Sequence, residues 1–391
     1  MSQLLNERWS ETKEALLEGL QGNRKSSMAV CLENTRKYLA ESATAGATSA
    51  GNIATLNRVI LPVIRRVMPT VIANEIIGVQ PMTGPVGQIH TLRVRYADNG
   101  DQVVAGEEAL SPFKIAAAYS GNNTDATPKA NTTAAMEGTP GKRMSIQILK
   151  APVEAKSRKL SARWTFEAAQ DAQAQQGIDI EAEIMAALAQ EITAEIDQEI
   201  LASLSGLATV EQTYDQSLVS GTATFVGDEH AALAIQINRV ANLIAQRTRR
   251  GAANWAVVSN QALTILQSAT TSAFARTTEG TFEAPTNTKF VGTLNNAMRI
   301  YVDAYKADTD DDNQVLIGYK GASEADAPAF YCPYIPLMSS GVVLDPNTFE
   351  PVVGFLTRYG YVELTNTASS LGNAADYLGK VRIVHNNVSF K

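Results

Sequence analysis

The histidines are the residues of this chain best suited to bind a metal ion or to transfer a proton. His90, His230 and His385 lie in three unrelated segments. None of them has a cysteine, another histidine or a carboxylate at the spacing of metal ligands. His90 is predicted on a strand face and His230 at the start of a helix, so we expect structural roles, with no metal and no cofactor.

Residues 308–313 (Asp-Thr-Asp-Asp-Asp-Asn) resemble the start of a calcium-binding loop. The sixth position of such a loop requires a glycine for its sharp turn, and here it is Asn313. The twelfth position requires a glutamate that binds the ion with both oxygens, and here it is Tyr319. The pattern therefore favours an acidic turn between two strands.

The serines and Cys332 show no pattern typical of a catalytic nucleophile, because they lack a glycine-flanked turn and a paired histidine. The glutamates over 181–199 are too regular and too numerous for the carboxylate pair of a glycosidase. Arg247, Arg249 and Arg250 cluster where a helix is predicted to end, and complementing the helix dipole explains them. A contact with nucleic acid or with a neighbouring subunit near a symmetry axis is the alternative. We expect a protein that is not an enzyme and has no catalytic residues.

The charged residues are segregated along the chain. No lysine or arginine occurs between Arg163 and Arg239, and that interval contains thirteen aspartates and glutamates. Its acidic residues of interest are Glu181, Glu183, Glu191, Glu195 and Glu199. The segment before it is basic, with Lys142, Arg143, Lys150, Lys156, Arg158, Lys159 and Arg163.

Two interpretations of this segregation stay open. The two segments are solvated faces that differ in sign, or the basic segment of one copy lies over the acidic helix of a neighbouring copy. In the second case complementary charge sets the register between subunits. Assembly would then be weakened by salt.

The acidic residues belong to the strongest predicted element, a helix over 178–205. Its apolar residues recur every four positions, as in a helix with one buried face, and are Ile184, Leu188, Ile192, Ile196, Ile200 and Leu204. The basic residues belong to a predicted two-stranded projection that leaves the body near Tyr96 and returns near Phe166. Between its strands, residues 97–145 have the composition of a protruding functional loop.

Other elements flank these two. A helix at about 229–247, a strand at 255–258, a short helix at 261–268 and strands at 289–293, 298–303 and 314–319 predict a mixed α/β subdomain. At the N-terminus, two amphipathic helices precede a stretch of small residues at 42–51. They predict an arm whose apolar stripes require a partner surface.

Composition agrees with a folded protein. The 391 residues are 45% hydrophobic and carry a net charge of −7, which argues against a uniformly basic nucleic-acid binder. Cys31 and Cys332 are interpreted as reduced core residues, with no disulfide. No secretion signal precedes residue 10 and no apolar run reaches the ~18 residues of a membrane span, so we expect a cytosolic product without membrane contact.

Two separated motifs resemble one protein family. The first covers 78–88 and contains Gly78, Pro81, Gly84, Pro85 and Gly87. The second covers 331–360 and contains Pro333, Pro336, Gly354, Arg358 and Gly360. Together with Leu92-Arg93, they are similar to the major capsid proteins of T-even-like contractile-tailed bacteriophages, over about residues 50–365.

The resemblance implies an α+β fold of the HK97-like capsid type. Its parts would be an N-terminal arm (1–55), an extended β-hairpin loop (97–163), a peripheral domain (56–96 and 164–227) with a spine helix (178–205), an axial domain (228–330), and C-terminal strands (331–391) that return to the peripheral domain.

The resemblance also implies a function. Hexamers and pentamers of one protein would build the head shell of a virion around double-stranded DNA, which they contact non-specifically, after assembly in the host cytoplasm. Vertex, decoration, scaffolding, portal and prohead-protease proteins would be partners. An encapsulin-like shell that packages cargo proteins is the alternative.

Three further expectations come from the resemblance. Large members of the family insert a folded domain in the extended loop. Here residues 115–142 are short and poor in apolar residues, so we expect no separate folded insertion. The family is cut by its protease after Leu-x-Glu or Ile-x-Glu, which residues 39–41 match, so Glu41 is a candidate cut site; residues 5–7 match as well. If uncut, the arm would fold against the inner shell. Arg93 and Arg358 are candidates for buried or inter-subunit ion pairs.

Overall fold

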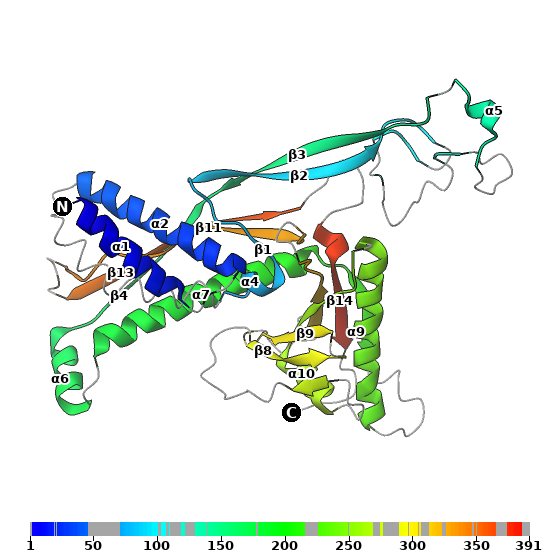
Figure 1. The fold of residues 1–391 in the computed structure, drawn as a ribbon. Coiled ribbons are helices and arrows are strands. Elements are labelled where there is room, and N and C mark those ends of the chain that lie inside the picture. The colour runs from blue at the N-terminus through cyan, green and yellow to red at the C-terminus, as the bar shows by residue number, and fades with distance from the viewer. Residues whose placement is uncertain are drawn as a thin grey trace.

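The computed structural model contains two β-sheets, a long helix that reaches from one to the other, and a hairpin that projects beyond both (Figure 1). It describes residues 2–18, 20, 22–45, 71–100, 103–106, 109, 119–121, 130–138, 140–176, 179–215, 226–248, 250–268, 274–276, 289–295, 297–303, 305, 313–322, 326–345, 348, 350–364 and 374–384. Helices and sheets form separate groups, so the predicted α+β class is confirmed. The arm, hairpin, long helix and second sheet implied for an HK97-like fold are all present.

The body sheet has β13 as its central strand. It is built from β1 (Gly78–Val79), β4 (Lys156–Arg163), β11 (Ala329–Ser339), β12 (Val343–Leu344) and β13 (Pro351–Glu363). β13 pairs antiparallel with β11, β12 and β4, and β1 adds to β11 in parallel. Alternate residues of β13, such as Val353 and Phe355, are buried because one face of the sheet meets the helices.

That face is covered by α7 (Ile180–Leu207) and by the arm, which consists of α1 (Ser2–Leu17) and α2 (Gly22–Ala45). Ile192, Ile196 and Leu204 of α7 are at most 1% exposed, which confirms the predicted apolar stripe. Met28 and Leu32 of α2 join the same core. The apolar stripes of the arm are therefore buried against the body of the same chain. The short helix α4 (Ala73–Ile76) precedes β1, and α6 (Phe166–Gln176) precedes α7.

The second sheet has the strand order β5-β14-β10-β6-β9-β8-β7. Its strands are β5 (Val210–Asp215), β6 (Trp255–Val258), β7 (Phe274–Arg276), β8 (Lys289–Leu294), β9 (Met298–Val302), β10 (Gln314–Gly318) and β14 (Leu378–Val384). Two helices, α9 (Val226–Thr248) and α10 (Asn260–Ser268), share a core with it. A 3₁₀ turn, η1 (Ala374–Tyr377), leads into β14.

Two predicted domain limits are wrong at this sheet. β14 was expected to return to the peripheral part with the other C-terminal strands, but it lies between β5 and β10 of the second sheet. β5 was likewise assigned to the peripheral part, yet it pairs in parallel with β14. Both strands are short and pair with partners that are distant in sequence, so local pattern carried no information on which sheet they join.

The hairpin is formed by β2 (Val86–Tyr96) and β3 (Met144–Glu154), which pair in unbroken register from Val86↔Glu154 to Tyr96↔Met144. The small helix α5 (Thr133–Met136) lies beyond their far end (Figure 1). The predicted limits of the projection, near Tyr96 and Phe166, are therefore wrong. The projecting pair begins at Val86, and β4 belongs to the body sheet because it pairs with β13.

None of the helices in the described part of the chain is both long enough and apolar enough to span a membrane.

Candidate assembly interface

The hairpin presents an apolar face to solvent along β3. Met144, Ile146 and Ile148 lie on one side of the strand, because side chains alternate, and they are 53%, 68% and 59% exposed. A two-stranded hairpin without a third layer is barely stable alone, and exposed apolar patches of this kind mark protein contacts. This apolar hairpin face is therefore a candidate interface with another chain.

A small core holds the hairpin tip together. Tyr96 and Tyr119 are both buried, with ring centroids 4.6 Å apart. The Tyr119 hydroxyl donates to the backbone oxygen of Arg143 at 2.6 Å and accepts from the backbone nitrogen of Asp98 at 3.2 Å. The segment is poor in apolar residues, but Val103 and Ala109 join the two tyrosines in this small core.

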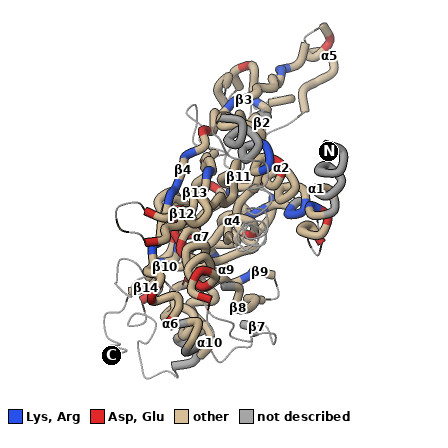
Figure 2. Tube along the Cα trace, turned by 90° about the vertical axis from the view of Figure 1, so that its left-hand side faces the viewer, with Lys and Arg blue, Asp and Glu red and all other residues tan. Residues whose placement is uncertain are grey.

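The structure separates the seven basic residues that were predicted to project together. Lys142 and Arg143 lie at the far end of the hairpin and Lys150 lies on β3. The remaining four lie on β4, at the body sheet (Figure 2): Lys156, Arg158, Lys159 and Arg163. The prediction of one basic projection is wrong for these four.

Several of these cations have partners within the chain. The guanidinium of Arg143 lies 3.4 Å from an oxygen of Asp98, and the backbone nitrogen of Arg143 donates to the same carboxylate. These two hydrogen bonds lower the pKa of the Asp98 carboxyl, and the bond from the backbone has the larger effect. Arg163 lies 3.7 Å from Glu350. The ammonium of Lys142 lies 5.4 Å from the ring centre of Tyr119.

Arg158 binds two of the glutamates that were predicted to face a neighbouring copy. Its guanidinium donates to Glu195 at 2.7 Å and to Glu199 at 2.5 Å, both on α7 of the same chain. Its Nε donates to the Tyr359 hydroxyl at 2.6 Å, and that hydroxyl donates to Glu199. Partial burial raises the pKa of Glu199, but the hydrogen bonds from Tyr359 and Arg158 outweigh it, so the net direction is down. These hydrogen bonds among Arg158, Tyr359 and the two glutamates join β4, β13 and α7.

The other predicted acidic residues remain available to a neighbour. The Asp179 side chain caps α7 by accepting from the backbone nitrogen of Glu181 at 3.1 Å, and carboxylates such as Glu181 and Glu183 suit the first turn of a helix. Glu183 and Glu191 are exposed. Within the described residues, no lysine or arginine pairs with these three, so their inter-subunit role stays a prediction.

The first sequence motif forms the junction between body sheet and hairpin. Gly78 pairs with Phe330 in β1, and the segment through Pro81 continues along β11, since the Met82 nitrogen donates to the Pro333 oxygen at 3.0 Å. The Ala155 nitrogen then donates to the Pro85 oxygen at 2.9 Å where the hairpin starts.

Gly360 allows the hairpin base to cross the body sheet. A Cβ at this position would lie 2.3 Å from Cγ1 of Val153 and 3.2 Å from the Glu154 oxygen. The glycines at 84, 87 and 354 are less constrained, because the nearest atoms to an added Cβ lie at 3.8, 3.5 and 3.4 Å. The close approach of β3 to β13 thus explains Gly360 directly.

The prolines of the second motif interrupt a central strand. Proline has no backbone N–H to donate within a sheet. The pairing of β11 with β13 accordingly shifts register twice, once between Pro333 and Ile335 and once between Ile335 and Met338. The Thr357 hydroxyl, which is buried, donates to the Ile335 oxygen at 3.2 Å and satisfies that carbonyl.

Arg358 stacks on an aromatic ring. Its guanidinium carbon lies 5.3 Å from the ring centre of Tyr334, and within the described residues no carboxylate pairs with it. The buried or inter-subunit ion pair expected for Arg358 therefore stays a prediction. The side chain of Arg93 lies outside the described residues.

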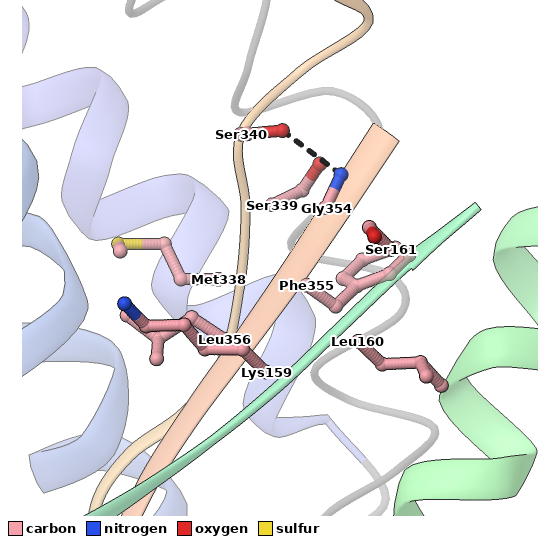
Figure 3. Close-up of a pocket in the computed structure, with 9 residues that line it drawn as sticks. All are labelled: Lys159, Leu160, Ser161, Met338, Ser339, Ser340, Gly354, Phe355 and Leu356. Carbon is pink, nitrogen blue, oxygen red and sulfur yellow. Dashed lines mark hydrogen bonds between the residues drawn. The ribbon is translucent and has the colours of Figure 1, made fainter. Parts of the chain in front are cut away.

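A cavity of about 390 Å³ opens beside β4, β11 and β13 (Figure 3). It is lined by Lys159, Leu160, Ser161, Met338, Ser339, Ser340, Gly354, Phe355 and Leu356. The Ser340 hydroxyl accepts from the Gly354 nitrogen at 2.9 Å, and no histidine or carboxylate lines the cavity beside its serines.

The remaining candidates for chemistry have structural partners. His90 is exposed on β2, and Nδ1 of the buried His230 lies 2.5 Å from the Ser268 hydroxyl. His385 and residues 308–312 lie outside the described residues. The buried Asn313 accepts from Ser259 at 2.6 Å. In the parts that the structure describes, no three histidine, cysteine or acidic residues gather as metal ligands would.

The arginines after α9 also pair within the chain. Arg247 lies 2.6 Å from Glu211, and Arg250 lies 2.5 Å from Asp326, while Arg249 lies outside the described residues. Cys31 and Cys332 are free and buried, and burial raises the pKa of each thiol to about 12.

Sequence reasoning missed two carboxylates. Asp197 is 1% exposed on the apolar face of α7, and Glu75 binds cations from two other parts of the chain. A signal for Asp197 was present, since an aspartate directly after Ile196 interrupts an otherwise apolar face. Glu75 gave no signal, because its partners Arg24 and Arg299 are distant in sequence.

Solved structures with similar folds come from phages. A structure titled "Microbacterium phage Oxtober96" is 12% identical with a TM-score of 0.45, covering 80% of this chain and 90% of that one. "The capsid of Myoviridae Phage XM1" is 10% identical with a TM-score of 0.41, covering 79% and 90%. At these scores the assignment rests on sequence.

Sequence relatives are closer. The major capsid protein of Vibrio phage KVP40 is 30% identical over 84% of this chain and 80% of the relative. That of Enterobacteria phage T4 is 29% identical over 83% and 78%. The family model described as "Major capsid protein Gp23" matches residues 53–139 and 123–383, two parts that overlap at the hairpin tip. This chain belongs to the Gp23 family of major capsid proteins.

Proposed function

We propose that this chain assembles with copies of itself, as hexamers and pentamers, into a phage head shell that encloses double-stranded DNA. Its membership of the major capsid protein family carries the proposal, and its place is the virion capsid. The encapsulin-like alternative is not favoured, because the matched relatives are phage capsid proteins.

The apolar hairpin face supports a contact between subunits. It extends beyond the body, and its apolar side chains are exposed as far as the described residues show (Figure 1). The rigid tip and the unbroken pairing of β2 with β3 hold this face in place, so little ordering is lost when it binds. We infer that the hairpin of one copy lies on the body of the next.

The role is structural. The matched relatives are capsid proteins, and neither a histidine nor a carboxylate lines the described cavity. We infer that the chain has no enzymatic activity of its own and holds no cofactor. Vertex, decoration, scaffolding and portal proteins belong to the proposal as partners of the shell, and contacts with DNA would be non-specific.

Processing of the arm by a prohead protease is a further part of the proposal. The candidate cut after Glu41 lies within α2, whose helix extends to Ala45. Proteases bind extended chain, so the end of α2 must unwind before a cut. If the arm is retained, its packing on the body sheet gives it a stable place beneath the shell.

Electron microscopy of the purified protein in negative stain tests the proposal. Rings, tubes or shells are expected. Ile146→Asp, which puts a charge on the apolar hairpin face, should abolish them, while Ile235→Asp on α9 is a matched control because both isoleucines are 68% exposed. Particles that are absent from the unaltered protein at every salt concentration would contradict self-assembly, and equal effects of the two variants would contradict the role of the hairpin.

A further inference from the structure

Glu75 of α4 is bound by side chains from two separate parts of the chain. Its Oε1 pairs with Arg24 of α2, in the arm. Its Oε2 accepts from Arg299 at 3.0 Å and from the Tyr301 hydroxyl at 3.2 Å, both on β9 of the second sheet. One carboxylate therefore links the arm to the second sheet.

The backbone around Glu75 is tied to the same parts. The ammonium of Lys320, just after β10, donates to the Asn74 oxygen at 2.9 Å. The Ile72 nitrogen donates to the buried Asp197 of α7 at 2.9 Å. α4 is four residues long and has no side-chain cap, so these contacts, together with the burial of Ile76, set its position.

The repulsion between the two cations at this junction is offset only while Glu75 is ionised. The guanidinium groups of Arg24 and Arg299 are held on the two oxygens of a single carboxylate, which places them near each other. If Glu75 were neutral, two cations would face each other across the junction. Partial exposure moderates the effect, since the side chains of Arg24, Glu75 and Arg299 are 43%, 27% and 61% exposed.

We propose that Glu75 couples the docking of the arm to the seating of the second sheet against the body. While the arm is docked, Arg24 fixes one oxygen of the carboxylate and so orients the other toward Arg299 and Tyr301. When the arm leaves, that orientation is lost and β9 is held less firmly. Detachment of the arm is thereby transmitted through Glu75 to the second sheet.

Hydrogen exchange on the unassembled full-length chain tests this coupling. Arg24→Gln, a change in the arm, should speed exchange in the arm and also in β9 by roughly three- to fivefold, as expected for a partly exposed pair. Glu14→Gln on the exposed side of α1 is the control and should leave β9 unchanged.

A charge-balance test separates coupling from simple loss of a contact. Glu75→Gln should speed exchange in α2 and β9 together. Adding Arg299→Gln to Glu75→Gln removes the repulsion and should slow exchange in α2 again. If Arg24→Gln affects the arm alone, or if the double variant restores nothing, the coupling is overturned. The measurement needs no shell, so it is independent of whether the protein assembles.

Discussion

Asp197 is the least expected residue in the core. Its Oδ1 accepts from the backbone of Ile72, but Oδ2 has no partner among the described residues. Burial raises the pKa of Asp197 to about 7; the hydrogen bond from Ile72 opposes this rise and the nearby Asp303 adds to it. The folded chain therefore takes up a proton near neutral pH that the unfolded chain releases.

Replacing Asp197 by asparagine should stabilise the protein at pH 8. Because the pKa of Asp197 is raised in the folded state, the protein loses stability as the pH rises from the pKa of the unfolded state, near 3.8, to that of the folded state, about 7. Over this range the folded state must bury a charge that the unfolded state exposes to water. The gain should be roughly 1–3 kcal/mol at pH 8, since one pKa unit is worth about 1.4 kcal/mol and asparagine can still accept from Ile72. Urea unfolding at pH 5 and pH 8 measures it, and an equal effect at both values would contradict the assignment.

Gly360 sets how closely the hairpin base approaches the body sheet. Gly360→Ala should destabilise the chain by about 1–3 kcal/mol, because its Cβ would meet Val153 and the backbone of Glu154. Thermal unfolding should show a lower midpoint than for Gly354→Ala, on the same strand, where the nearest atom is the movable Ser340 hydroxyl at 3.4 Å. Equal midpoints for the two variants would mean that β3 can move away from β13 without loss of stability.

Elements with a local apolar pattern could be predicted from the sequence. The helix expected at 178–205 is α7, and the strands expected at 289–293, 298–303 and 314–319 are β8, β9 and β10. The hairpin limits could not be predicted, because β2 and β4 alternate in the same way and only the pairing of β4 with β13 distinguishes them. Nothing near β4 in the sequence specifies that partner.

The same reason limited prediction of the candidate interface. One of the two interpretations of the charge segregation laid the basic segment, which contains Arg158, over the acidic helix of a neighbouring copy, which contains Glu195 and Glu199. In the structure they meet within one chain, because β4 lies beside α7. The apolar hairpin face was missed as an interface, since period-2 alternation does not reveal which apolar side chains of a strand pair stay exposed.

Salt should weaken assembly only modestly. Lys142 and Lys150 on the hairpin and the exposed Glu183 and Glu191 on α7 are among the groups that can attract between copies. Raising NaCl from about 50 to about 500 mM shortens the range of that attraction. Sedimentation velocity should show fewer assembled particles, and Glu183→Gln with Glu191→Gln should flatten the dependence. Assembly that strengthens with salt would assign the interface to the apolar face alone.

On the scale of the whole molecule, the two sheets are interlocked by the chain path. β13 completes the body sheet and β14, further on, completes the second sheet. Val381 and Ile383 of β14 are fully buried in the core under α9. The second sheet is therefore not a unit that a single continuous stretch of sequence can fold.

A chain that stops after Leu364 should lose the second sheet. Without β14, β5 has no partner and β10 has an open edge. The fluorescence of Trp255, buried in β6 next to β10, should shift to the red as the strand opens to water. A chain that stops after residue 386 keeps β14 and is the control. Unchanged fluorescence in the shorter chain would show that the sheet is stable without its inserted strand.

The late position of β13 and β14 has a consequence for synthesis on the ribosome. Until translation passes residue 363, β4 and β11 lack the strand between them, and until it passes residue 384, the second sheet lacks its inserted strand. Strand pairing over such distances is slow to form, and unfinished edges are exposed meanwhile. A prematurely terminated chain consequently cannot present a complete body to a neighbour. Translation to the end thus becomes a condition for entering the particle, and incomplete subunits are excluded from it.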